Sequence, residues 1–355
     1  MLSPAPGARV KSLPQTLRRC TVAFVVAAVL PALASCNGLG TPSHQSGTAG
    51  RSTPAAPTPT AVPDASPTTA SLLPHRRTAL VVAAGDIACN PLDRKFGVGL
   101  GEETGCKQRA TSDLIGQLHP SAVLPLGDNQ YQHGTYQGFL ASYAPTWGRY
   151  RSMSHPVIGN HEYDTPHAAG YFSYFGRAAG DPRKAYYSFD LARWHVVVLN
   201  NAGCMYIGGC GKGSPQERWL RQDLAAHRSR CTLAAWHEPR FSSGQHGSNP
   251  AFQTLWEDLF AGGVDVVLAG HDHDYERFQP LDAAGRPASD GVRSFVVGTG
   301  GVGLRRLPPA AAAGTVVRQD TTFGVLALQL RPTDYDWNFV PVGGTFGDSG
   351  HGTCR

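Results

Sequence analysis

The chain has 355 residues and a formal net charge of +5, from 31 basic and 26 acidic side chains. Residues 1–77 hold seven of the basic residues and one acid, so the remainder, with 24 basic and 25 acidic residues, is close to neutral. A near-neutral domain lacks the basic face that a nucleic-acid groove needs, so we expect no nucleic-acid partner. The length would permit two average domains, but the N-terminal part does not have the composition of a folded one.

The N-terminus has the pattern of an export signal. Basic residues precede an apolar run from Cys20 to Leu33, which is too short to span a bilayer comfortably. The run ends in Leu33-Ala34-Ser35-Cys36, which resembles a bacterial lipobox, where the peptidase cuts before a lipidated cysteine. We therefore predict a signal peptide over 1–35, a membrane anchor on Cys36 and an extracytoplasmic protein, lipid-anchored or secreted. The alternative is an ordinary signal peptide in which Cys36 is incidental.

Residues 36–77 consist mainly of Ser, Thr, Pro, Ala and Gly, with almost no large apolar side chain. Such a segment cannot bury enough surface to offset its chain entropy, so we predict a disordered tether. Its proline and threonine content favours an extended, semi-stiff spacer. The folded domain is then expected over 78–355.

From Thr78 onward, short apolar runs alternate with amphipathic segments. The runs predict buried strands, and the segments between them predict helices, two of which begin at Ser214-Pro215 and Asn249-Pro250 with a capping residue before proline. This order indicates one α/β domain, a layered β-sandwich of mixed sheets flanked by helices. The expected strands are 79–84, 122–126, 156–158, 195–199, 233–236, 264–269, 295–297 and 325–330, with strand-rich stretches at 186–200 and 323–340, and the expected helices are 108–118, 135–143, 215–227 and 250–261.

Six cysteines remain once Cys20 and Cys36 are set aside, and an even number in an exported domain predicts disulfides. Cys89 with Cys106 and Cys204 with Cys210 would each close a loop, and Cys231 with Cys354 would fix the C-terminus. This is one of fifteen possible connectivities.

Polar residues of the metal-ligand type follow five of the apolar runs. Gly85-Asp86 comes after the first, Gly127-Asp128-Asn129-Gln130-Tyr131 after the second and Gly159-Asn160-His161-Glu162 after the third, while His237-Glu238-Pro239 and Gly270-His271-Asp272-His273 follow later runs. Any one of these could be a turn, a helix cap or a core histidine. The carboxyl ends of strands meet at one edge of a layered α/β fold. The occurrence of all five motifs at such strand ends therefore predicts a single site.

This order of motifs resembles the calcineurin-like metallophosphoesterase superfamily over roughly residues 78–340, and within it the purple acid phosphatases. Most other members begin with Asp-x-His, whereas Asp86 is followed by Ile87 and Ala88. Tyr131 stands where purple acid phosphatases have a tyrosine ligand. The N-terminal fibronectin-like domain of the plant enzymes has no counterpart in this sequence.

The resemblance implies two metal ions, with Fe(III) beside Fe(II), Zn or Mn, a choice that these donor types also favour. It implies hydrolysis of small-molecule phosphate monoesters outside the cytoplasm, with His161 contacting phosphate or protonating the leaving oxygen. The implied ligands are Asp86, Asp128, Tyr131 and His273 for one ion and Asp128, Asn160, His237 and His271 for the other, so that Asp128 bridges.

Alternatives within the same fold stay open at this point. A phosphodiesterase or nucleotidase would use the same metal site, and an inactive tethered binding protein would keep the fold without catalysis. Loop histidines His133 and His246 could line the pocket. Arg240 or Arg277 could bind a phosphate oxygen, and Arg277 could equally pair with a nearby acid. The glycine-rich stretch 298–301 is interpreted as a tight turn beside the site, since glycine clusters are weak signals for phosphate binding.

Overall fold

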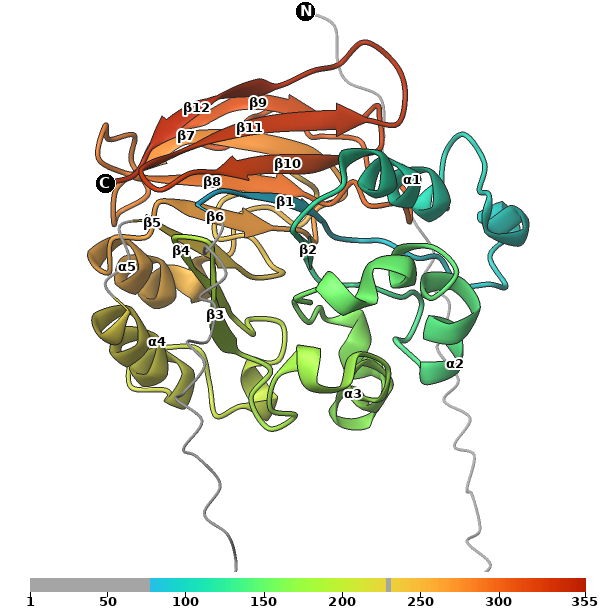
Figure 1. Cartoon of the computed structure of the whole chain (residues 1–355), viewed down its shortest axis with the longest axis horizontal. Helices are drawn as coiled ribbons and strands as arrows, with labels where there is room; N and C mark the ends of the chain where they lie inside the picture. The colour runs from blue at the N-terminus through green and yellow to red at the C-terminus, as the bar shows by residue number, and fades with distance from the viewer. Residues whose placement is uncertain (1–76, 228–230) are drawn as a thin grey trace, which may run out of the picture. The chain divides into compact units, whose positions relative to one another are not determined.

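The strands form two sheets, shown in Figure 1 for the computed structural model, which describes residues 77–227 and 231–355. The smaller sheet has the strand order β12-β11-β10-β1-β2. Strand β1 pairs parallel with β2 and antiparallel with β10, and the other pairs are antiparallel. Its members are β1 (Ala79–Ala84), β2 (Ala122–Pro125), β10 (Gly324–Leu330), β11 (Asp334–Pro341) and β12 (Ser349–Thr353).

The larger sheet has the order β3-β4-β5-β6-β8-β7-β9. Its four inner strands β4, β5, β6 and β8 run parallel, and β3, β7 and β9 pair antiparallel at the two sides. Parallel strands covered on both faces are mostly apolar, as the fully buried β4, β5 and β6 are here apart from His195 and Thr232. The members are β3 (Tyr187–Leu191), β4 (Trp194–Val198), β5 (Cys231–Ala235), β6 (Val266–Ala269), β7 (Tyr275–Leu281), β8 (Val292–Val297) and β9 (Thr315–Gln319).

Alternate side chains of the larger sheet belong to different cores, because successive strand residues point to opposite faces. Val196 and Val198 of β4 pack with residues of the smaller sheet such as Leu326. Val197 instead packs with Leu220 on the outer face, beneath α4 (Pro215–Ala226) and α5 (Gln253–Ala261). Figure 1 shows these two helices along the outer side of the larger sheet. The domain is thus layered, as the sequence predicts.

The remaining helices surround the smaller sheet and the loops that follow β2. They are α1 (Gln108–Leu118), α2 (Tyr136–Gly138), which continues into a π-helix at Phe139–Tyr143, and α3 (Ala169–Phe175). Ser214 caps α4 as predicted, since its side chain accepts a hydrogen bond from the Glu217 N–H. Single-turn and short 3-10 helices lie at Arg94–Gly99, Trp147–Met153, His161–Asp164, Pro166–Ala168, Gly176–Ala179, Cys204–Tyr206 and Pro250–Phe252.

The predicted α/β sandwich is confirmed, with one wrong strand. Residues 156–158 form only an isolated bridge, Leu126 with Val157, because Pro156 has no N–H to donate to a ladder. All three anticipated disulfides are present: Cys89–Cys106, Cys204–Cys210 and Cys231–Cys354.

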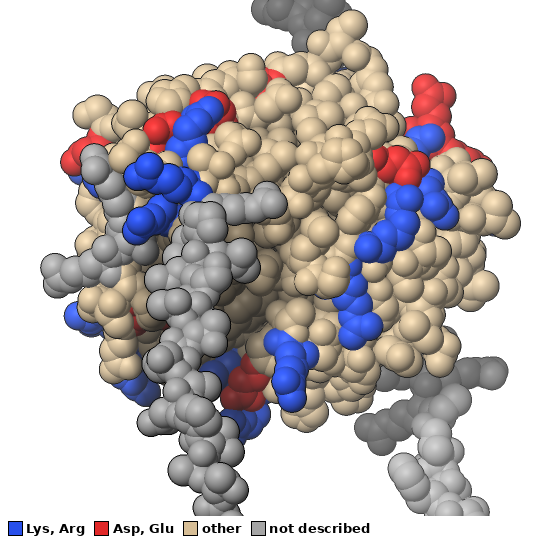
Figure 2. All heavy atoms as spheres, viewed as in Figure 1, with Lys and Arg blue, Asp and Glu red and all other residues tan. Residues whose placement is uncertain are grey.

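Several predictions concern residues outside the described ones, namely the signal peptide, the lipid anchor on Cys36 and nearly all of the tether. Among the described residues, no helix is long and apolar enough to cross a bilayer. On the face drawn in Figure 2, basic side chains are scattered over a mostly uncharged surface, several of them next to acidic ones.

Candidate metal centre

The polar residues that follow the strands lie together at one edge of the two sheets. Asp86 follows β1 and Asp128 follows β2 of the smaller sheet, whereas His237 follows β5 and His271 follows β6 of the larger one. The parallel ladders of β1 with β2 and of β5 with β6 bring each pair of strand ends side by side. The site therefore forms where the carboxyl ends of strands from the two sheets meet.

Three of these residues have an unusual backbone. Asp86, Asp128 and His271 adopt positive φ angles of 59°, 46° and 71°. Non-glycine residues in that region cost about 1–3 kcal/mol each, and such strain is concentrated at functional sites. Gly127 shares the positive φ, at 88°, and has a second reason to be glycine: a Cβ there would lie 2.4 Å from Nδ1 of His237.

One half of the donor set surrounds the Tyr131 hydroxyl. Its oxygen lies 2.8 Å from Asp86 Oδ1, 2.8 Å from Asp128 Oδ2 and 3.2 Å from His273 Nε2. His273 Nε2 is also 3.4 Å from Asp86 Oδ1. Two carboxylates, a phenol and an imidazole thus present their donor atoms to one point.

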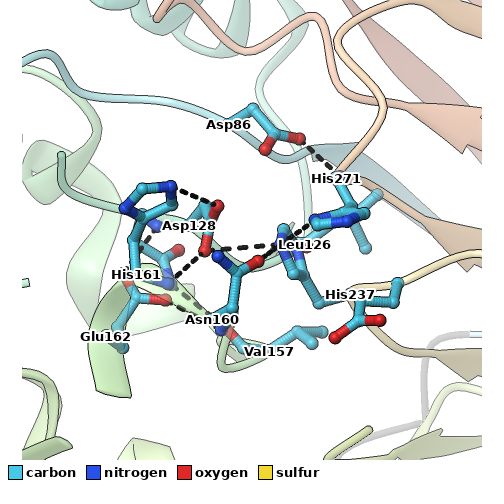
Figure 3. Close-up of polar contacts among 12 residues, drawn as sticks. Asp86, Leu126, Asp128, Val157, Asn160, His161, Glu162, His237 and His271 are labelled. Carbon is cyan, nitrogen blue, oxygen red and sulfur yellow. Dashed lines mark hydrogen bonds and ion pairs between the residues drawn. The ribbon is translucent and has the colours of Figure 1, made fainter. Parts of the chain in front are cut away.

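The other half lies around His237 and is drawn in Figure 3. His237 Nε2 is 3.3 Å from Asp128 Oδ1, 3.2 Å from Asn160 Oδ1 and 3.3 Å from His271 Nδ1. Asp128, His237 and His271 form a group whose ligand atoms all lie within 4.8 Å of one another. Asp128 belongs to both halves, as the bridging role requires.

The imidazoles are oriented for metal binding. Nδ1 of His237 donates to the Leu126 carbonyl at 2.8 Å, and Nδ1 of His273 donates to the Gly303 carbonyl at 2.7 Å. A carbonyl can only accept, so Nδ1 of each ring carries a proton and Nε2 is the atom that faces the carboxylates, the orientation typical of metal-binding histidines. Burial and the charge of His237 lower the pKa of His271 to about 3, which keeps that ring neutral. The residues present fit two metal ions.

The same cluster carries buried charge. Asp86 is fully buried and Asp128 is 2% exposed. Burial acts to raise the pKa of Asp128, but the neighbouring His237 outweighs it and holds the pKa well below its usual range. At His237 burial opposes the charged form, yet the two carboxylates raise its pKa to about 10. Burial and then the carboxylates raise the pKa of Tyr131 well above its ordinary value. The carboxylates are therefore charged and need cations close by.

His161 lies at the rim of the cluster, with its side chain 18% exposed, and points toward the Asp128 carboxylate in Figure 3. Its Nδ1 lies 2.6 Å from the Gln132 carbonyl and its Nε2 3.7 Å from Asp128 Oδ2. The carbonyl requires an N–H on Nδ1, so Nε2 is the atom that faces the donors. Its backbone N–H donates to Asp128 Oδ1 at 2.9 Å, which holds both residues in place.

The two loop histidines differ in position. His133 pairs with Asp164 at 3.0 Å and its side chain is 62% exposed. His246 lies against the donor cluster, with its ring centroid 4.2 Å from that of His271. Burial is the main cause that lowers the pKa of His246, and Arg305 acts in the same direction.

Neither arginine considered from the sequence faces the cluster. Arg277 forms an ion pair with Asp348 at 2.8 Å, and Nε of Arg240 donates to Gln253 at 2.9 Å. Arg277 thus has the structural ion pair that was its alternative role, and Arg240 is bound to Gln253. In the glycine-rich stretch 298–301, the N–H groups of Gly298 and Gly300 donate to the carbonyls of Asp274 and Gly85, so these two N–H groups are already hydrogen-bonded within the protein.

Two residues support the cluster in roles that the sequence did not indicate. The buried Glu162 accepts hydrogen bonds from the N–H groups of Asn129 at 2.8 Å and Gly159 at 2.8 Å, which ties the Asp128 loop to the Asn160 loop. Burial and then the Asp128 charge raise the pKa of Glu162 to about 8. The Asn201 side chain accepts from the N–H of His237 at 3.1 Å.

These features define a class of α/β protein, in which two mixed sheets bring buried carboxylate, imidazole, amide and phenol donors together at one edge. The chain belongs to the calcineurin-like phosphoesterase family, whose model matches residues 74–275, more than half of the chain. The resemblance inferred from the sequence is confirmed.

Purple acid phosphatases are among the relatives. Purple acid phosphatase 18 of Arabidopsis thaliana is 28% identical over 242 residues, covering 62% of this chain and 53% of that protein. Uncharacterized protein Rv2577 of Mycobacterium tuberculosis is 30% identical over 158 residues, covering 38% of this chain and 30% of that one. Purple acid phosphatase PPD1 from yellow lupin shares the fold, with a TM-score of 0.61 at 19% identity over 77% of this chain and 53% of that chain. This chain spans about half or less of the length of the curated relatives.

Proposed function

We propose that this protein is a dinuclear metal hydrolase that cleaves phosphate monoesters of small molecules outside the cytoplasm. The observation that carries the proposal is the convergence of the donor atoms, with the Nε2 atoms of His237 and His273 turned toward two buried carboxylates by backbone carbonyls. We take Fe(III) with Fe(II), Zn or Mn as the metal pair, because a phenol, carboxylates and imidazoles are hard to borderline donors.

The ligand sets follow the two halves of the cluster. Asp86, Asp128, Tyr131 and His273 would hold one ion, and Asp128, Asn160, His237 and His271 the other. Bound metal ions supply Lewis acidity, which lowers the pKa of water and neutralises charge on the phosphoryl group. His161 carries a proton on Nδ1 toward Gln132, so in its charged form it donates from Nε2 to the leaving oxygen.

A comparison of a monoester with a diester tests the activity. Purified full-length protein loaded with iron and zinc should release p-nitrophenolate from p-nitrophenyl phosphate faster than from bis(p-nitrophenyl) phosphate, and a chelator should stop both reactions. Metal analysis should find two ions per chain. A chelator-resistant reaction, or protein that holds no metal, would refute the proposal, and a preference for the diester would favour a phosphodiesterase.

The location rests on Leu33-Ala34-Ser35-Cys36 and on the disulfides, since disulfides persist in oxidising compartments. Cys36→Ser should release the protein from membranes or leave it unprocessed, while the catalytic domain remains active. Mass spectrometry of the wild-type N-terminus is the check, and a soluble wild type without lipid contradicts the anchor.

A further inference from the structure

The guanidinium of Arg305 contacts His246, the loop histidine that lies against the metal centre. The backbone N–H of Arg305 donates to the carbonyl of the ligand residue His273 at 3.0 Å. Two residues earlier, the Gly303 carbonyl accepts from Nδ1 of the same histidine at 2.7 Å. The segment that carries Arg305 is therefore fixed to the backbone and to the ring of a metal-binding residue.

The side chain of Arg305 is directed by His246. Its Nη1 donates a hydrogen bond to Nε2 of His246, whose ring lies 4.2 Å from the His271 ring. A second contact joins the two loops, because Gln245 Nε2 donates to the Arg306 carbonyl at 3.1 Å. The Arg305 backbone is thus bound to His273, and its guanidinium is bound to His246, whose ring lies against His271.

Arg305 has no acidic partner among the described residues. Arg277 is neutralised by Asp348. Within residues 77–227 and 231–355, the half-buried Arg305 makes its one side-chain polar contact with the imidazole of His246. Arginine has five N–H donors, so most of them remain available to an anion.

We propose that Arg305 binds the non-bridging oxygens of the phosphoryl group and selects monoesters over diesters, with His246 as its positioning residue. This inference rests on the proposed function. Near neutral pH a phosphate monoester carries close to two negative charges, whereas a diester carries one and has an extra substituent on an oxygen. A guanidinium fork binds two phosphate oxygens at once. A monoester offers it three non-bridging oxygens and a diester only two, with one negative charge less, so the diester gains less from the contact.

The test compares Arg305→Gln and Arg305→Lys with the matched control Arg306→Gln, the exposed neighbouring arginine. Each full-length variant is first checked for metal content. Calorimetry then measures the affinity for inorganic phosphate, and kinetics measure kcat/KM for p-nitrophenyl phosphate and its bis ester. We expect Arg305→Gln to weaken phosphate binding and to lower monoester kcat/KM about 10- to 100-fold, the effect of losing a charge-assisted hydrogen bond.

The diester reaction of Arg305→Gln should fall by less than about 3-fold, Arg305→Lys should recover part of the monoester rate, and Arg306→Gln should match the wild type. Unchanged phosphate affinity in Arg305→Gln, or equal losses for both esters, would overturn the proposal. If the wild type hydrolysed neither ester, the proposed function would fail on its own, while the calorimetric comparison of wild type with Arg305→Gln would still decide whether Arg305 binds phosphate.

Discussion

Asp128 is the donor on which the two halves of the site depend. Its Oδ2 lies 2.8 Å from the Tyr131 hydroxyl, and its Oδ1 lies 3.3 Å from His237 Nε2. Its backbone is held at a positive φ, and a Cβ on Gly159 would lie 2.2 Å from its Oδ1. The surrounding chain thus fixes the carboxylate where it can face two ions at once.

Replacing Asp128 should separate metal binding from acid catalysis. Asp128→Asn keeps the shape but removes the charge, so we expect loss of bound metal and a fall in kcat of more than about 100-fold. His161→Ala should keep both ions and lower kcat by about 100- to 10,000-fold, as for a lost general acid. Metal analysis combined with steady-state kinetics distinguishes the two variants. Wild-type metal content and activity in Asp128→Asn would contradict the bridging role.

Tyr131 gives the site a spectroscopic signature. Burial and the two carboxylates keep its phenol protonated in the metal-free protein, so its proton must leave when iron binds. Phenolate bound to Fe(III) absorbs visible light, and iron-loaded protein should be pink to purple. Tyr131→Phe should lose the band and bind iron more weakly, with an unchanged circular dichroism spectrum. A colourless iron-loaded wild type would exclude phenolate ligation.

The ligand positions could be anticipated from the sequence because each follows a strand or a recognisable motif. Arg305 and Glu162 could not, because their partners are distant: His246 is 59 residues from Arg305, and Asn129 is 33 residues from Glu162. The same distance effect explains why the acid that pairs with Arg277 could not be named from the sequence, since Asp348 lies 71 residues away. Motifs report local chemistry, whereas long-range pairing needs the folded chain.

At the level of elements, a buried ion pair joins the hairpin of β3 and β4 to α4. The ring of His195, 1% exposed, lies 2.9 Å from Asp190 through Nδ1 and 2.8 Å from Asp223 through Nε2. Ser188 also donates to Asp223 at 2.7 Å. Burial acts to lower the pKa of His195, but the hydrogen bonds to Asp223 and Asp190 outweigh it and raise the pKa.

This contact should make stability depend on pH. Because the pKa of His195 is raised by folding, its contribution is complete below the unfolded value of about 6.5 and is lost as pH rises through the folded value. At Asp223 burial acts to raise the pKa, but the hydrogen bonds outweigh it and lower the pKa. The contribution of Asp223 to stability is therefore complete above the unfolded pKa of about 3.9 and is lost as pH falls through the folded pKa. The pair is therefore most stabilising between about pH 4 and 6.5.

We expect His195→Gln to lower the free energy of unfolding by about 1–3 kcal/mol at pH 5.5 and by less at pH 9. His227→Gln is the comparison: that ring also faces Asp223, at 3.2 Å, but its side chain is 45% exposed, so we expect a smaller loss than for His195→Gln. Urea unfolding at both pH values gives the comparison. An equal loss at pH 5.5 and pH 9 would show that packing, not the ion pair, is responsible.

Helices and strands that carry a capping residue or an apolar run could be predicted from the sequence, and those without either could not. The capped helix that begins at Pro215 and the buried parallel strands have such signals. Strand β7 contains Glu276, Arg277 and Pro280, and β12 has the sequence SGHGT, so neither shows an apolar run. These strands form because neighbouring strands supply hydrogen-bond partners.

At the scale of the whole domain, Cys231–Cys354 connects the two sheets. Cys231 begins β5 of the larger sheet, and Cys354 follows β12 of the smaller one. Nearby, the Arg355 N–H donates to Asp265 at 2.7 Å, which adds a second attachment for the C-terminus. His237 follows the opposite end of β5, about 20 Å away at roughly 3.3 Å per residue. This disulfide is therefore remote from the metal centre, whereas Cys204–Cys210 closes the loop after Asn201, the residue that holds the His237 backbone.

Removing one disulfide at a time should show that Cys231–Cys354 mainly affects stability and that Cys204–Cys210 mainly affects activity. A chain-entropy estimate gives about 5 kcal/mol for the sequence separation of 123 residues and about 2 kcal/mol for that of six. The double replacement of Cys231 and Cys354 by Ser should cost more unfolding free energy and increase hydrogen exchange in β12, with metal content and kcat/KM retained. The double replacement of Cys204 and Cys210 should cost less stability but lower kcat/KM, because Asn201 then loses its support beside His237. Equal stability losses, or lost metal in the Cys231 and Cys354 variant alone, would contradict this division between the two ends of β5.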